Sequence, residues 1–168
     1  MECILREWRE ADAKELACIM NNKNIQDNLR DGIPYPYTQQ DAAVFIERMM
    51  TRDKNRLFAF AIEAEGRLVG SISVSRMDNV HLRTGEMGYY IGQNYWNKGY
   101  GSSAARQIVQ YVFDNTDIVR IFAEPYAYNS ASCKALEKAG FTFEGLLRKN
   151  AFKYGKFVDM KMYAVIKE

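Results

Sequence analysis

The chain has 168 residues, of which 48% are hydrophobic and 26% are charged. This length supports one well-buried core and is too short to expect two, so we expect a single domain over residues 1–168. Lysine and arginine number 23 against 21 aspartate and glutamate, and the net charge of +2 provides no general field that would attract nucleic acid or an anionic membrane. We therefore expect neither of these as a partner.

The cysteines and the histidine argue against a metal site and against disulfides. The three cysteines, Cys3, Cys18 and Cys133, are odd in number and far apart, and the single histidine, His81, has no ligand partner nearby in sequence. We expect no metal. Charged residues interrupt the apolar residues of the N-terminus, and no run approaches the length of a membrane span, so we expect a cytoplasmic protein.

Apolar spacing predicts the first elements. Residues 2–7 read as a short strand, and one apolar helical face follows over residues 13–20. The prolines of residues 34–36 interrupt any helix in the next loop. Thr38 is then a typical N-cap for a helix whose apolar stripe runs from residue 42 to residue 49.

A predicted hairpin and a third strand come next. Residues 57–62 form an unbroken apolar run, a glycine turn follows, and residues 68–74 alternate apolar and polar side chains. The third strand covers about residues 83–91. Because Gly85 and Gly88 interrupt it, we expect a β-bulge there.

A turn with two glycines follows this strand and opens onto an amphipathic helix. This glycine turn reads Tyr95-Trp96-Asn97-Lys98-Gly99-Tyr100-Gly101-Ser102. Glycines let the backbone approach a ligand closely, and the unpaired N–H groups at the start of a helix favour an anion such as a phosphate or pyrophosphate. Lys98 precedes both glycines and Ala104 stands where a third glycine would fall, so neither a P-loop nor a dinucleotide fold is indicated.

The remaining elements complete the predicted topology. The helix of the glycine turn has an apolar stripe over residues 104–113, a strand follows at 119–123 and a helix at 129–139, and strands at 141–147 and 158–166 end the chain. The predicted order is β-α-α-β-β-β-α-β-α-β-β. This order indicates an α+β fold with a mixed, mostly antiparallel sheet that carries helices on both faces.

Together with this order, two motifs resemble the GNAT superfamily of N-acetyltransferases. They are the glycine turn and the run Asn129-Ser130-Ala131-Ser132 followed by Ala139-Gly140-Phe141. Residues 28–38, residues 85–91 and Tyr154-Gly155 followed by Asp159 further resemble the RimJ/RimL branch, which acetylates protein N-termini. The resemblance covers nearly the whole chain and implies the GNAT fold.

The resemblance implies acetyl-CoA as the acetyl donor. Backbone amides of the glycine turn would hold the pyrophosphate of coenzyme A; the residues concerned are Trp96, Asn97, Lys98, Gly99, Tyr100, Gly101 and Ser102. The interrupted strand would leave an edge unpaired, so that the pantetheine arm bonds to Tyr89 and Ile91 as an additional strand does. A backbone N–H near Tyr89 or Tyr90 would polarise the thioester carbonyl.

The resemblance also implies catalytic roles. Glu86 stands where the family usually offers a carboxylate to the incoming amine, and it is the candidate general base. Many relatives use a tyrosine to donate a proton to the leaving thiolate, but Glu137 stands at that position here. Ser132 is therefore the expected donor to the sulfur, while Asn129 would bond to the pantetheine arm.

Each of these assignments has a structural alternative. Glu86 also reads as a solvated strand charge paired with a nearby Arg or Lys, and Ser132 as a polar residue in the first turn of a helix that Asn129 caps. Trp96 is expected to pack beneath the glycine turn. Cys133 reads as a small apolar filler, because no histidine accompanies it.

The acceptor is less defined by the sequence. Tyr35 and Tyr37, in the proline loop, are expected to line an acceptor groove or else to cover the core. The leading acceptor is a protein N-terminal amine, and a small amine such as a polyamine, an amino acid or an aminoglycoside is the alternative. A non-catalytic acyl-CoA sensor is the rival from another class, and a monomer or a homodimer is expected.

Overall fold

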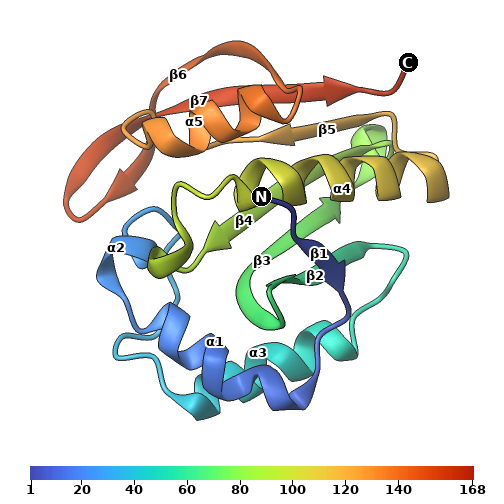
Figure 1. The fold of residues 1–168 in the computed structure, drawn as a ribbon. Coiled ribbons are helices and arrows are strands. Elements are labelled where there is room, and N and C mark those ends of the chain that lie inside the picture. Colours follow the sequence, from blue (N-terminus) through green and yellow to red (C-terminus); the bar gives the residue numbers. More distant parts are fainter.

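A seven-stranded sheet in the order β1-β2-β3-β4-β5-β7-β6 runs through the molecule (Figure 1). The computed structural model describes residues 1–168. The strands are β1 (Ile4–Arg6), β2 (Leu57–Ala64), β3 (Arg67–Arg76), β4 (Thr84–Ile91), β5 (Arg120–Ala123), β6 (Thr142–Lys153) and β7 (Lys156–Ile166). Only β4 and β5 pair in parallel, which confirms the predicted mixed and mostly antiparallel sheet.

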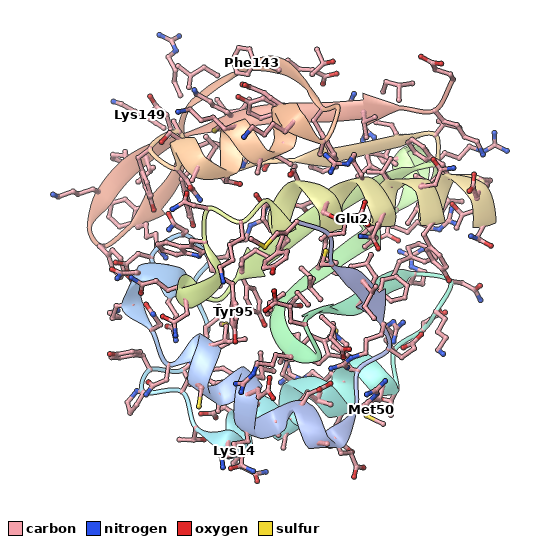
Figure 2. All side chains as sticks on the ribbon, viewed as in Figure 1. Glu2, Lys14, Met50, Tyr95, Phe143 and Lys149 are labelled. Carbon is pink, nitrogen blue, oxygen red and sulfur yellow. The ribbon has the colours of Figure 1, made fainter.

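Helices cover both faces of this sheet. They are α1 (Ala13–Met20), α2 (Lys23–Gln26), α3 (Gln39–Met50), α4 (Tyr100–Asn115) and α5 (Ser130–Lys138). In Figure 2, Lys14 and Met50 mark the layer of α1 and α3, and Phe143 marks the outermost strand β6. As predicted, Thr38 caps α3, because its side chain accepts the N–H of Asp41. None of the helices combines the length and apolar character that a membrane span needs.

Two apolar cores hold the layers together. The larger one joins the sheet to α4 and α5 and contains the fully buried Ile72, Ile108 and Ile121. The smaller one joins the other face to α1 and α3 through residues such as Leu16 and Ile46. Burial of apolar area on both faces stabilises the sheet, at about 25 cal/mol per Å². Cys133 is buried in the larger core, as expected of a filler.

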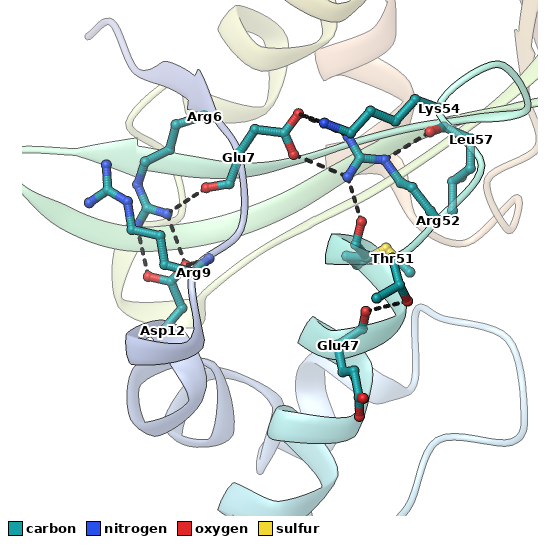
Figure 3. A network of polar contacts seen from close by, with 10 residues as sticks. Arg6, Glu7, Arg9, Asp12, Glu47, Thr51, Arg52, Lys54 and Leu57 are labelled. Atoms are coloured by element: carbon teal, nitrogen blue, oxygen red, sulfur yellow. Dashed lines mark hydrogen bonds and ion pairs between the residues drawn. The ribbon is translucent and has the colours of Figure 1, made fainter.

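A polar network fixes β1 against α1 and α3 (Figure 3). Arg6 donates two hydrogen bonds to the carboxylate of Asp12, at 2.8 and 2.9 Å, and also pairs with Glu63 on β2. Arg52, after α3, donates to Glu7 and to the C=O of Leu57. These contacts set the helical layer at a defined position on the sheet.

Strand β4 contains no β-bulge, so the prediction from Gly85 and Gly88 was wrong. It pairs with β3 in unbroken register from Gly70↔Ile91 to Arg76↔Gly85. Close packing explains Gly85 instead, because a Cβ there would lie 2.5 Å from Cγ1 of Val74.

Strands β4 and β5 separate beyond Glu86. Their parallel pairing ends at Glu86↔Phe122, although β4 continues along β3 as far as Ile91. The later part of β4 therefore has an open edge toward β5, as expected. This gap lies at the carboxyl ends of two parallel strands, which is where ligands bind in open α/β sheets.

Candidate functional site

A cavity of about 670 Å³ occupies the gap between β4 and β5. Its wall combines residues 28–30, β4, the glycine turn, the end of β5 and α5. Eleven of the residues predicted from sequence line it: Glu86, Tyr89, Ile91, Trp96, Asn97, Gly99, Tyr100, Gly101, Ser102, Asn129 and Ser132. Residues far apart in the chain are thus brought to one site.

At one end of the cavity, the glycine turn presents unpaired backbone amides. Gly99 has φ +81°, a conformation that glycine adopts without strain, and Asn97 has φ +62°. No backbone acceptor receives the N–H groups of residues 97–102; the first bond of the helix runs from the N–H of Ser103 to the C=O of Gly99 (3.1 Å). Together with the positive end of the α4 dipole, these donors could hold a phosphate or diphosphate.

The open edge of β4 leads away from these amides. Backbone groups along a strand alternate between its two sides. The N–H of Gly92 donates to the C=O of Val69 on β3 (2.8 Å), so the N–H groups of Tyr89 and Ile91 point to the opposite, open side. They offer two donors to an extended chain that carries amides.

Two residues of the glycine turn are held by their side chains. The indole Nε1 of Trp96 donates to the C=O of Ile91 (2.7 Å), so Trp96 fastens the turn to the end of β4. The Nζ of Lys98 lies 5.7 Å from the ring centroid of Tyr95, which Figure 2 labels between the N-terminal helices and α4. Lys98 is not part of the cavity wall.

Helix α5 contributes a serine and a capping asparagine. The side-chain oxygen of Asn129 accepts the N–H of Ser132 (3.2 Å), so Asn129 is the N-cap of α5. The Oγ of Ser132 lies 3.2 Å from the hydroxyl oxygen of Tyr89. Burial raises the pKa of Tyr89, and the hydrogen bond with Ser132 opposes this rise. The sequence did not indicate this hydroxyl pair.

The opposite end of the cavity is acidic. Glu86 pairs with the guanidinium of Arg30, whose Nη2 also lies 3.8 Å from Oε2 of Glu124. Burial raises the pKa of Glu124, the negative charge of Glu86 raises it further, and Arg30 opposes both. Neither Arg30 nor Glu124 was predicted from the sequence as a site residue. The position of Glu124 directly after β5 was the available signal.

The segment that carries Arg30 crosses to the C-terminal half of the molecule; we call residues 27–31 the strap. The C=O of Leu29 accepts the hydroxyl of Tyr126 (3.0 Å) and the Nζ of Lys153 (2.9 Å). Lys153 is buried and also donates to Asp31 (2.9 Å). The backbone beside Arg30 is therefore anchored.

Neither Tyr35 nor Tyr37 lines this cavity, and of the two expected roles Tyr37 takes the second, that of covering the core. Tyr37 is 8% exposed and packs in the smaller core. It lies between the proline loop and Thr38, the N-cap of α3, and this position places it beside the helical layer. Tyr35 is exposed, with the Nζ of Lys23 5.0 Å from its ring centroid. Glu137 also lies outside the cavity wall, where it accepts the hydroxyl of Tyr163 (2.9 Å).

The chain matches a known family over most of its length. A family model described as Acetyltransferase (GNAT) domain matches residues 2–142. A Bacillus subtilis (strain 168) protein named uncharacterized N-acetyltransferase YnaD is 28% identical over 165 residues, which cover 98% of this chain and 94% of that protein.

Two solved structures share the fold. RimL, a ribosomal alpha-N-protein acetyltransferase in complex with coenzyme A, has a TM-score of 0.86 at 19% identity, covering 99% of this chain and 95% of that one. Spermidine N-acetyltransferase from Vibrio cholerae, in complex with CoA and spermine, has a TM-score of 0.80 at 21% identity, covering 99% and 96%. The topology of these proteins is therefore that of the sheet and helices described above.

Proposed function

Because this chain belongs to the GNAT family of N-acetyltransferases, we propose that it transfers the acetyl group of acetyl-CoA to the α-amine of a protein N-terminus, by direct transfer in a ternary complex. One observation carries the proposal. A single cavity joins the unpaired amides of the glycine turn, the open edge of β4 and the carboxylate of Glu86. A diphosphate, an amide-bearing arm and an amine each meet a complementary group along this path.

The donor is held by backbone groups. We assign the pyrophosphate of coenzyme A to the amides of residues 97–102, because they lack acceptors within the protein. The pantetheine arm would lie along β4 and bond to the N–H of Ile91 and the C=O of Tyr89, with Asn129 close to its thiol end. Lys98 would add charge at the rim only after leaving the ring of Tyr95.

Glu86 is the proposed general base. An N-terminal α-amine has a pKa of about 8, so about a tenth of it is unprotonated at neutral pH. Glu86 would take the first proton directly or through water, and the free amine would form the new C–N bond at the thioester carbon. The nitrogen would then lose its second proton to water as the C–S bond breaks. The N–H of Tyr89 points to the open side of β4, where it would stabilise the oxyanion.

Ser132 is the proposed donor to the departing sulfur. When the C–S bond breaks, the electron pair stays on the sulfur, and a hydroxyl that donates a hydrogen bond stabilises this thiolate. Ser132 lines the cavity and is hydrogen-bonded to Tyr89. Glu137, which stands where many relatives have the donor tyrosine, lies outside the cavity wall. The hydroxyls of Ser132 and Tyr89 supply hydrogen-bond donors in its place.

Similarity to RimL supports a protein N-terminus as the acceptor, and similarity to the spermidine enzyme supports a small polyamine as the second candidate. The test measures acetyl transfer from radiolabelled acetyl-CoA to peptides with free or blocked α-amines and to spermidine. We expect transfer to the free α-amine alone. Transfer to spermidine alone would select the second candidate, and tight acetyl-CoA binding with no transfer to any amine would contradict both.

A further inference from the structure

A second hollow adjoins the cavity on the acceptor side. It has a volume of about 370 Å³ and shares Arg30, Glu124, Tyr126 and Met160 with the cavity. Its other walls are Asp31 and residues 150–153 of β6. Glu124 therefore stands where the two spaces meet, so that an acceptor entering from the hollow passes Glu124 on its way to Glu86.

Two carboxylates share one guanidinium at this junction. The Nη2 of Arg30 contacts Glu86 and lies 3.8 Å from Glu124. The side chains of Glu86 and Glu124 are only 25% and 20% exposed, whereas that of Arg30 is 65% exposed. Arg30 thus reaches in from solvent and places a cation between the carboxylates, which is the charge that an incoming ammonium carries.

The charge balance changes when Arg30 withdraws. Burial and the charge of Glu86 both raise the pKa of Glu124, and Arg30 is the group that lowers it. Once the acceptor's ammonium has replaced the guanidinium and given up its proton, no cation remains between the carboxylates, so Glu124 holds a proton more tightly than it does beside Arg30. The charged and titratable groups around Glu124 are Glu86 from β4, Arg30 and Asp31 from the strap, Tyr126 after β5 and Lys153 from β6.

We propose that Glu124 works with Glu86 as a carboxylate pair that binds the acceptor's ammonium in place of Arg30, and that the pair takes up the ammonium proton and keeps it on Glu124. This inference rests on the proposed function and assigns it a second catalytic carboxylate. The N–H bond of the ammonium breaks, its proton forms an O–H bond on Glu124, and its electron pair becomes the nucleophile. The pair then returns the proton to solvent after the product leaves.

The test compares four variants in a kinetic and a binding measurement. Glu124→Gln should lower kcat at least tenfold, since a general base contributes about 10²- to 10⁴-fold, and should move the acid limb of the kcat profile against pH. Glu144→Gln removes a carboxylate that pairs with Arg120 outside the cavity, and it should leave both unchanged. Arg30→Ala should lower the KM for the amine, because the competing cation is gone.

The binding measurement needs no turnover. Calorimetric titration of an amine-bearing peptide into the complex with coenzyme A should show about tenfold weaker binding for Glu86→Gln and Glu124→Gln, but not for Glu144→Gln. Equal binding by all four variants would overturn the proposal, even if no acetyl transfer is found. Equal loss of kcat in Glu124→Gln and Arg30→Ala, with the acid limb unmoved, would also overturn it, because Glu124 would then only position Arg30.

Discussion

The hydroxyl oxygen of Tyr89 lies 3.2 Å from that of Ser132, and this contact joins β4 to α5 across the gap that forms the cavity. Tyr89 also packs closely against the glycine turn, because a Cβ on Gly101 would lie 3.0 Å from its Cε2 atom. One side chain therefore links the amide-rich end of the cavity to the proposed thiol end.

Ser132→Ala should lower kcat about tenfold with little change in acetyl-CoA affinity. The hydroxyl stabilises a thiolate that exists only as the C–S bond breaks, and a hydrogen bond to a charged group contributes about 1.5–3 kcal/mol. Steady-state kinetics and calorimetry measure the two quantities. Ser130→Ala, on the same helix but outside the cavity wall, is the control. An unchanged kcat in Ser132→Ala would remove Ser132 from the mechanism.

Gly99→Ala should weaken acetyl-CoA binding, by about fivefold. Gly99 has φ +81°, and a residue with a Cβ pays about 1 kcal/mol in this region, so the turn relaxes and its amides lose their common direction. Gly145→Ala serves as the control, since a Cβ there meets nothing within 4 Å and its φ is not positive. The prediction fails if titration calorimetry gives both variants the wild-type affinity.

Asp12→Asn should lower the free energy of unfolding by about 2–3 kcal/mol at neutral pH. Burial alone would raise the pKa of Asp12, but the hydrogen bonds from Arg6 and from the N–H of Arg9 outweigh it and lower the pKa. The pKa of this carboxyl is lower in the folded protein than in the unfolded chain, where it is about 3.9. The ionised carboxylate therefore stabilises the fold fully at pH values above about 3.9, and this stabilisation is lost as the pH falls through the pKa of the folded state.

The difference in the free energy of unfolding between wild type and Asp12→Asn should therefore shrink as the pH falls below about 4. Urea unfolding at several pH values measures it. Asp114→Asn is the control, because Asp114 is exposed and should change the free energy by less than about 0.5 kcal/mol. A constant difference from neutral to acidic pH would contradict the assigned ion pair.

Lys153→Met should loosen the strap and leave acetyl-CoA affinity unchanged. Methionine fills the space of the lysine stem but cannot donate to Leu29 or Asp31, so the strap is held less firmly beside the acceptor site. Amide hydrogen exchange should quicken over residues 27–31 in this variant and not in Lys156→Met, whose side chain is exposed. Unchanged exchange over the strap would show that other contacts suffice to hold it.

Apart from the four-residue helix α2, which was not predicted, the order of elements and the glycine turn were predictable because their signals are local. Apolar periodicity, the Thr38 cap and the glycines of residues 99 and 101 act within a few neighbours, and the structure confirms the elements that they predict. The β-bulge was wrong for a non-local reason. Position 85 requires a glycine because Val74 on the adjacent strand leaves no space for a Cβ, and that contact has no signal within β4.

The sequence by itself determined the fold, the order of the elements other than α2, and the glycine turn at the start of α4, since each follows from hydrogen bonding and burial over short spans. Only the tertiary structure decided the composition of the proposed acceptor end. Arg30, Glu86 and Glu124 come from three distant segments, and the strap and the separation of β4 from β5 bring them together. The same packing buries Tyr37 in the core, because its place is set by long-range contacts with α1 and α3.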